Sequence, residues 1–225
     1  MLGRLGMTVD ECIRVYRTVG KRVLIHKKHA IIPVRSNGAF SAGVFEEAIK
    51  QTVREFCTNE ECVNRRRNGL STTCQHSDLP FRDQTCTKTV VLALTKVNVT
   101  ARPTLFRTYD QSTSLNGCTI WQVARATSAA TTFFKPMKLG RDEIEDIDAG
   151  LGYNNPCDKL IGEAKNAFPG RTNLQILSIG TGIWNVIEIN DKRPSVIDAM
   201  QKMQKMAICE VNFANTFRSA TTVSS

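Results

Sequence analysis

The sequence predicts an α/β protein with a largely parallel sheet flanked by helices. Segments of helical periodicity alternate with short apolar runs of the kind that buried strands show, and this alternation is typical of parallel α/β folds. The chain has 225 residues, of which 41% are hydrophobic, so it is large enough to bury a core.

The N-terminal part predicts two helices. Thr8 and Glu11 form a capping-box pattern, and apolar residues then recur at helical spacing over residues 9–19. A second helix is expected over residues 43–56, with Ser41 as its N-cap.

The middle of the chain predicts a loop, a strand and a helix. Residues 57–86 are polar and rich in turn-forming residues, which indicates a loop or insertion. The apolar run at 89–94 predicts a buried strand, and residues 119–130 predict a helix of small residues suited to close packing.

The C-terminal part continues the alternation. Residues 144–148 alternate with period two, which predicts a strand, and a helix is expected over about 157–167. Residues 174–179 predict another apolar strand that ends in Gly180-Thr181-Gly182, and a long helix is expected from Pro194.

Positive charge is concentrated in the first half of the chain. The net charge is +9, and eight of these charges lie in residues 1–110. No acidic residue stands between Cys12 and Phe45. Such a segment fits either a contact with an anionic bilayer or a solvated basic loop; its basic residues include Arg14, Arg17, Lys21, Arg22, Lys27 and Lys28. Nucleic-acid binding is not expected, because no recognised binding module is present.

The eight cysteines do not predict a metal site by their spacing. Cys57 and Cys62 are followed by Cys74, His76 and Cys86, but zinc ligands usually come as closely spaced pairs on tight turns. A structural zinc site there is the less favoured alternative; scattered thiols in a reducing compartment are the favoured interpretation, and no metal or cofactor is expected.

The best candidate for catalysis is Asp148. This residue ends the strand predicted at 144–148, lies on the same face as Asp146 and is followed by a turn of small residues. A partly desolvated carboxylate there could act as a base, although a solvated acidic turn is the simpler alternative. The sequence holds no G-x-S-x-G motif, and none of its three histidines follows the later strands.

Three ordered motifs carry a family resemblance. Residues 121–134 read WQVARATSAATTFF, residues 148–156 read DAGLGYNNP and residues 177–182 read LSIGTG. Together they resemble the patatin-like phospholipase family in its fungal form. The start, residues 2–7 and 9–12, is similar to the stretch that follows the family's nucleophile helix.

The resemblance implies a lipid acyl hydrolase with a three-layer α/β/α fold and a Ser–Asp dyad that needs no histidine. By position the dyad aspartate is Asp148, and the motif around it comprises Ala149, Gly150, Asn154, Asn155 and Pro156. The implied substrate is a phospholipid or another lipid ester, cleaved as by a phospholipase A2 or a triacylglycerol lipase. The patatin-like domain is expected over residues 1–190 and a C-terminal helical extension over 191–225.

In this family the oxyanion loop and the nucleophile elbow precede the region that the chain matches. We therefore expect an N-terminally truncated domain that lacks the nucleophilic serine and is inactive by itself. The alternative is a non-catalytic patatin-like fragment that binds lipid or a partner protein. The sequence has neither a signal peptide nor a membrane-spanning run, so the expected location is the cytoplasm, with peripheral contact at membranes.

Overall fold

The computed structural model describes residues 1–24, 40–70, 74–97, 102–109, 117–130, 133–140, 142–153 and 155–179. The chain divides into two compact units, Met1–Ala149 and Gly150–Ser225. The first unit contains, in order, α1 (Leu2–Leu5), α2 (Val9–Val23), α3 (Ala42–Glu55), α4 (Glu60–Arg67), β1 (Val90–Thr95), β2 (Thr104–Arg107), α5 (Ile120–Thr127), β3 (Met137–Leu139) and β4 (Ile144–Asp148). A short 3-10 turn, η1 (Ala149–Leu151), follows β4, and α6 (Cys157–Ala167) belongs to the second unit.

The sheet of the first unit has the strand order β2-β1-β4-β3, and each neighbouring pair is antiparallel. The prediction of a largely parallel sheet is therefore wrong for the described strands. Residues 96–103 link β1 to β2 and residues 140–143 link β3 to β4, and links of this length are too short for the helical crossover that parallel strands need. Neither β2 nor β3 was predicted, because each is too short to show a periodic pattern.

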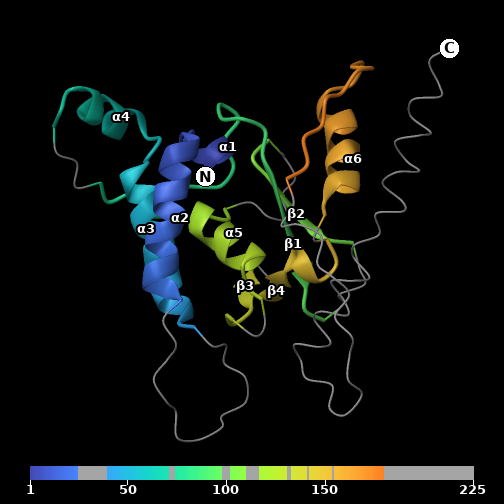
Figure 1. Cartoon of the computed structure of the whole chain (residues 1–225), viewed down its shortest axis with the longest axis horizontal. Helices are drawn as coiled ribbons and strands as arrows, with labels where there is room; N and C mark the ends of the chain where they lie inside the picture. The colour runs from blue at the N-terminus through green and yellow to red at the C-terminus, as the bar shows by residue number, and fades with distance from the viewer. Residues whose placement is uncertain are drawn as a thin grey trace, which may run out of the picture. The chain divides into compact units, whose positions relative to one another are not determined.

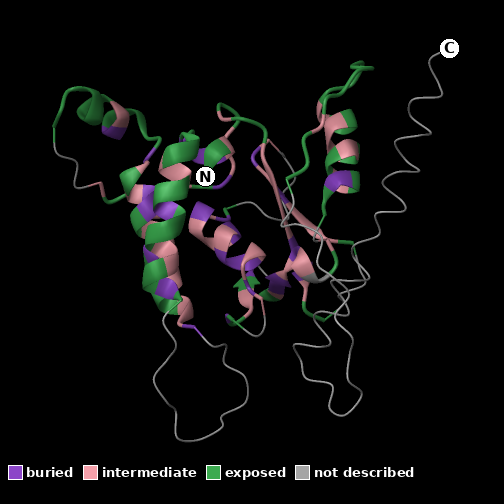
Figure 2. Cartoon of the chain, in the orientation of Figure 1, coloured by how far each residue is buried: buried purple, intermediate pink, exposed green. Residues whose placement is uncertain are grey.

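Helices cover one face of this sheet in successive layers (Figure 1). Helix α5 packs on β1, β3 and β4, α3 packs on α5, and α2 packs on α3. The main core lies between them, and the buried side of α5 is visible in Figure 2. This core comprises Leu5, Met7, Val15, Val53, Phe81, Ala93, Phe106, Cys118, Ile120, Val123, Ala126 and Leu139.

The predicted helices are confirmed at α2, α3, α5 and α6, and the strands predicted at 89–94 and 144–148 are confirmed as β1 and β4. The capping box at the start of α2 forms as expected. The Glu11 N–H donates to Thr8 Oγ1 over 3.3 Å, and the Thr8 N–H donates to Glu11 Oε2 over 2.7 Å. The Ser41 side chain caps α3 by accepting a hydrogen bond from the Val44 N–H. Capping satisfies backbone donors that a helix start leaves unpaired.

Two other predictions differ from the structure. Helix α4 lies within the predicted loop 57–86; it has almost no apolar periodicity, but Glu60 and Glu61 in its first turn and arginines in its last turn complement the helix dipole. Residues 171–179 have no regular secondary structure, so the strand predicted at 174–179 is wrong. Its Leu177 and Ile179 are exposed, because an apolar run forms a strand only where it finds a partner strand. The helix predicted from Pro194 and residues 180–182 lie outside the described residues.

In the second unit, the described residues form the end of η1, helix α6 and segments without regular secondary structure. The Asn155 side chain accepts a hydrogen bond from the Cys157 N–H at the start of α6, and Cys157 is buried. Among the described residues of either unit, no helix combines the length and the apolar character needed to cross a membrane.

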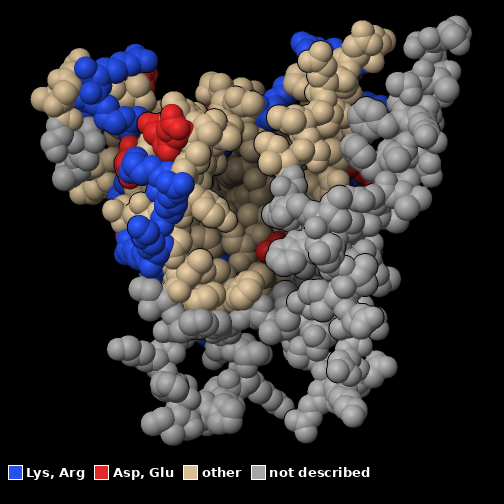
Figure 3. Space-filling view, in the orientation of Figure 1, with Lys and Arg blue, Asp and Glu red and all other residues tan. Residues whose placement is uncertain are grey.

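Lys and Arg side chains gather over the α2 and α4 side of the first unit (Figure 3). Two of the arginines on α2 are bound to α3. Arg14 forms an ion pair with Glu55 over 2.6 Å, and Arg22 donates to Gln51 over 2.7 Å. Part of the positive charge of α2 is therefore used to hold the two helices together, although exposed pairs of this kind contribute little stability.

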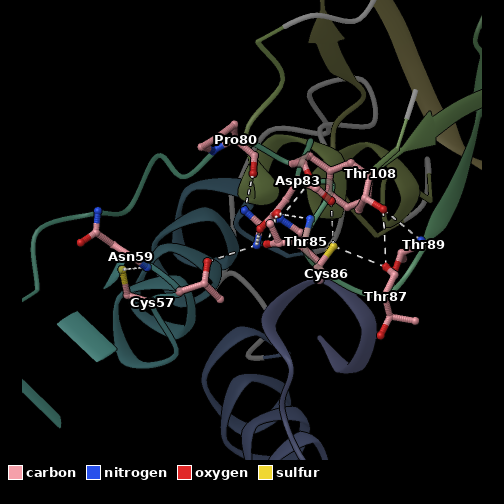
Figure 4. A network of polar contacts seen from close by, with 12 residues as sticks. Cys57, Asn59, Pro80, Asp83, Thr85, Cys86, Thr87, Thr89 and Thr108 are labelled. Atoms are coloured by element: carbon pink, nitrogen blue, oxygen red, sulfur yellow. Dashed lines mark hydrogen bonds and ion pairs between the residues drawn. The ribbon is translucent and has the colours of Figure 1, made fainter. Parts of the chain in front are cut away.

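A buried arginine joins the start of the chain to the segment before β1. The Arg4 side chain is 4% exposed and forms an ion pair with Asp83 over 3.0 Å. The same guanidinium donates to the carbonyl oxygens of Pro80 and Phe81 and to the hydroxyl of Thr58. Figure 4 shows Pro80 and Asp83 in this network, with the Asp83 region continuing to the threonines around β1. The charge is thus paired and its N–H groups are bound, as a buried arginine requires.

Replacing this arginine is expected to destabilise the first unit strongly. In Arg4→Met the partly buried Asp83 carboxylate loses its cation and two carbonyl groups lose a donor, so we expect the free energy of unfolding to fall by about 3 kcal/mol or more. Urea denaturation measures this change. Arg17→Met removes the same charge from an exposed position of α2 and should change the free energy of unfolding by less than about 0.5 kcal/mol. Equal effects of the two substitutions would contradict this role of Arg4.

Candidate functional site

The predicted catalytic residue, Asp148, ends a strand that is bonded on both sides. Strand β4 lies between β1 and β3, with Asp148 paired to Ala93 of β1 and Asp146 paired to Met137 of β3. Beyond the ladder, the Asp148 N–H donates to the carbonyl oxygen of Ala129, just after α5, over 3.2 Å. The residue Asp148 is half-buried. Its place therefore depends on the central strands and on α5, not on a surface loop.

A second carboxylate lies two residues earlier on the same face of β4. Asp146 is 2% exposed and accepts a long hydrogen bond from the Thr104 hydroxyl of β2, at 3.4 Å. Burial raises the pKa of Asp146 to about 6, which the hydrogen bond from Thr104 only partly offsets. Burial, followed by the nearby charge of Asp146, also raises the pKa of the Cys118 thiol. The core face of β4 thus holds a carboxylate that gains a proton close to neutral pH.

The residues around Asp148 fall into both compact units. Ala149 is buried at the end of the first unit, whereas Gly150, Asn155 and Pro156 belong to the second. Asn155 and Pro156 are exposed and precede α6, and Asn154 lies outside the described residues. The φ angle of Ala149 is not positive, so its backbone conformation does not require glycine.

The first unit also has a cleft of about 490 Å³ between α1, α2, α4 and the end of α3. Its lining includes Glu11, Arg14, Glu55 and Arg66, and neither Asp146 nor Asp148 contributes to it. The cleft and the predicted catalytic residue are therefore separate features of this unit.

The structure describes four of the six predicted lipid-contacting residues. Arg14, Arg17, Lys21 and Arg22 are all exposed on α2, whereas Lys27 and Lys28 lie outside the described residues. Exposed apolar side chains accompany them on the same helix: Tyr16 is 78% exposed and Ile13 is 44% exposed. The sequence did not indicate that these two apolar side chains would face outwards.

A set of metal-type ligands comes together elsewhere in the first unit. The ligand atoms of Cys57, Cys62, Cys74 and His76 all lie within 4.8 Å of one another. The sequence interpretation of these cysteines as scattered thiols therefore fails for three of them. Cys74 and His76 have one residue between them, and this close spacing could have indicated a pair of metal ligands. The 11 residues between Cys62 and Cys74 gave no indication that these two cysteines are close in space.

Comparison of the sequence with known proteins finds phospholipases and a patatin-like protein. The chain is 29% identical to the calcium-independent phospholipase A2-gamma of Homo sapiens over 192 residues, which cover 81% of this chain and 22% of that protein. The rat protein of the same name is similar to the same extent. A probable inactive patatin-like protein 9 of Arabidopsis thaliana is 36% identical over 73 residues, which cover 28% of this chain and 19% of that protein. No family model matches the chain, and no solved structure matches it.

These similarities support a lipid hydrolase-like class and, within it, the patatin-like family. The chain spans about a fifth of the length of the phospholipases that it matches.

The buried carboxylate of Asp146 should make stability depend on pH. Its pKa of about 6 in the folded state exceeds the value of about 3.9 in an unfolded chain. The folded state therefore binds this proton more tightly, and stability falls as the pH rises from about 4 to about 6. The loss is about 3 kcal/mol and is complete above pH 6.

The substitution Asp146→Asn removes this titration but keeps an oxygen for the Thr104 hydroxyl. Denaturation curves should show that the free energy of unfolding of the variant, relative to that of the unaltered chain, rises by about 3 kcal/mol between pH 4 and pH 8. Asp142→Asn, at an exposed position on the same hairpin, is the control and should leave the pH dependence unchanged. If the free energy of unfolding changed with pH in the same way in Asp146→Asn and in the unaltered chain, this would argue against a buried carboxyl group with a raised pKa.

Proposed function

We propose that this chain contributes the aspartate of a Ser–Asp dyad to a patatin-like lipid acyl hydrolase, and that Asp148 is this aspartate. One observation carries the proposal: the aspartate of the matching D-A-G motif ends a central strand of a chain similar over 81% of its length to a phospholipase. Because no G-x-S-x-G motif occurs in the sequence, this function requires a nucleophile from outside these 225 residues.

In this mechanism Asp148 acts as the general base. Its carboxylate accepts the proton of the serine hydroxyl while the serine oxygen attacks the acyl carbonyl carbon of the lipid. The proton then passes to the departing alcohol oxygen, and an acyl-serine ester remains. Asp148 next takes a proton from water, whose oxygen attacks the ester, and returns a proton to the serine as the fatty acid leaves. The two hydrogen-bonded neighbours of β4 favour this role, because a base must be held in place.

The exposed side of α2 supports contact with an anionic lipid surface. Arg17 and Lys21 are four positions apart and so share one side of the helix, and Tyr16 and Ile13 are exposed close to them. Cationic side chains beside exposed apolar ones are typical of helices that bind at the membrane interface. Each basic residue near an anionic surface contributes roughly 1 kcal/mol. Such contact would bring the acyl hydrolase to its substrate.

Fatty-acid release by a chimaera tests the role of Asp148. In the chimaera this chain replaces the aligned stretch of human calcium-independent phospholipase A2-gamma, and free fatty acid is measured with phosphatidylcholine vesicles. We expect activity in the chimaera and none in this chain alone. Asp148→Asn should lower the activity of the chimaera by roughly 10³-fold or more, since the serine then has no base.

The matched control is Asp142→Asn, which changes an exposed aspartate six residues earlier. It should leave fatty-acid release within about twofold of the parent chimaera. Release that survives Asp148→Asn, or that Asp142→Asn abolishes equally, would exclude Asp148 as the base.

Co-sedimentation with liposomes tests the membrane contact. The double variant Arg17→Glu/Lys21→Glu should bind vesicles containing 30% phosphatidylserine at least about tenfold more weakly than the unaltered chain, because two attractive charges become repulsive. The variant Lys165→Glu/Arg171→Glu makes the same change in charge at exposed positions in and after α6 and should bind normally. Binding that is insensitive to salt, or equal weakening by both variants, would contradict a contact through α2.

A further inference from the structure

Three thiols and an imidazole converge at the junction of α3, α4 and the segment that follows. Cys57 follows the C-cap of α3, Cys62 lies in α4, and Cys74 and His76 belong to the irregular segment before β1. Cys57 and Cys62 are buried and Cys74 is half-buried. The cluster is thus built by three separate pieces of chain, and none of its members belongs to the proposed dyad.

Four of the six distances between ligand atoms in the cluster are close to the edges of a tetrahedron around a metal ion, and all six are within 4.8 Å. Zn–S bonds of about 2.3 Å and Zn–N bonds of about 2.05 Å place two sulfurs about 3.8 Å apart and a sulfur and a nitrogen about 3.6 Å apart. The Cys62 and Cys74 Sγ atoms are 3.6 Å apart. His76 Nδ1 lies 3.4 Å from Cys62 Sγ, 3.4 Å from Cys74 Sγ and 3.7 Å from Cys57 Sγ. The 3.6 Å between the two sulfurs is much longer than a disulfide bond of about 2.05 Å.

The surrounding backbone supplies donors to the sulfur atoms. The Asn59 N–H points to Cys57 Sγ over 3.4 Å, and the His76 N–H points to Cys74 Sγ over the same distance. Such N–H groups stabilise thiolates and orient metal ligands. Arg66 of α4 donates to the carbonyl oxygen of Cys57 and so ties α4 to the end of α3. Three thiolates and one neutral imidazole around a divalent ion carry a net charge of −1, which suits the arginine-rich end of α4.

Helix α4 and its flanks have little else to hold them in place. Of the described residues in 58–80, Cys62 is the one buried side chain. Five of the eight residues of α4 are charged, and an isolated helix of this length is not stable in water. Figure 1 shows α4 set apart from the layers formed by α3, α5 and the sheet. A metal ion that binds four side chains supplies folding energy that such a segment cannot obtain from a core.

The fifth candidate ligand of this region is excluded. The Cys86 thiol donates to the carbonyl oxygen of Asp83 over 3.2 Å, and Cys86 is not in the cluster. Four protein ligands leave no open position for water or substrate, which is the arrangement of structural zinc sites. Tetrahedral sulfur and nitrogen ligands select zinc among the divalent metals that commonly bind in proteins without redox chemistry.

We propose that Cys57, Cys62, Cys74 and His76 form a structural zinc site that fixes α4 and the following segment to the end of α3. The site is independent of the proposed acyl hydrolase function. Its loss would unfold this region first and would leave the carboxylates of β4 in the sheet.

Metal analysis of the purified full chain tests the site. The chain is prepared under reducing conditions without added chelator, and its zinc content is measured by inductively coupled plasma mass spectrometry. We expect about one zinc ion per chain, since the four side chains complete one tetrahedral site. Cys62→Ala and His76→Ala should each retain less than about a tenth of this zinc. Cys86→Ala, the matched control from the same segment, should retain all of it.

Cobalt binding keeps the test independent of whether the variants fold. The unaltered chain is stripped of metal and titrated with Co²⁺, which should give the intense visible and near-ultraviolet absorption of tetrahedral cobalt with thiolate ligands, saturating at one equivalent and abolished by zinc. A reduced chain with neither zinc nor this spectrum would overturn the proposal. So would a Cys62–Cys74 disulfide in chain isolated with thiol-blocking reagent, stoichiometric iron in place of zinc, or an equal loss of zinc in Cys86→Ala.

Discussion

The ion pair between Arg4 and Asp83 connects three segments of the first unit that lie far apart in the sequence. One guanidinium binds Thr58, the backbone at Pro80 and the carboxylate of Asp83, so it joins the first residues of the chain to the end of α3 and to the segment that leads into β1. Hydrogen bonds from Thr85, together with the charge of Arg4, hold the pKa of Asp83 below its usual range although burial acts to raise it. Asp83 therefore stays ionised over the physiological pH range.

The two functional features of the first unit depend on this framework in different ways. Asp148 lies on a strand whose position is set by β1, β3 and the end of α5, all within the packed core. The cysteine cluster lies outside that core, in a region where charged helix α4 has little apolar surface to bury. Asp148 is thus positioned by hydrophobic packing and strand pairing, whereas the cysteine cluster depends on four side chains that converge on one point. A change in either can be studied without removing the other.

Much of the helical structure could be predicted because its signals are local. The capping box of Thr8 and Glu11 and the cap at Ser41 mark α2 and α3 within a few residues of sequence. The order and direction of the strands could not be predicted, because β2 and β3 form through partners far along the chain and have no pattern of their own. Asp148 could be named from a motif, but the depth at which Asp146 is buried could not. From the sequence the cysteine cluster was only the less favoured interpretation, because folding, and not sequence spacing, brings Cys62 next to Cys74.

The spacing of the four ligands also bears on how the chain can vary in length. Cys62 and Cys74 are separated by 11 residues, whereas Cys74 and His76 are separated by one. Lengthening a connection between two fixed ends costs free energy only with the logarithm of its length, so insertions between residues 67 and 73 should be tolerated. An insertion between Cys74 and His76 would instead move a ligand away from its neighbours. The sequence between residues 67 and 73 is therefore a suitable place in this protein to introduce an epitope or a fluorescent label.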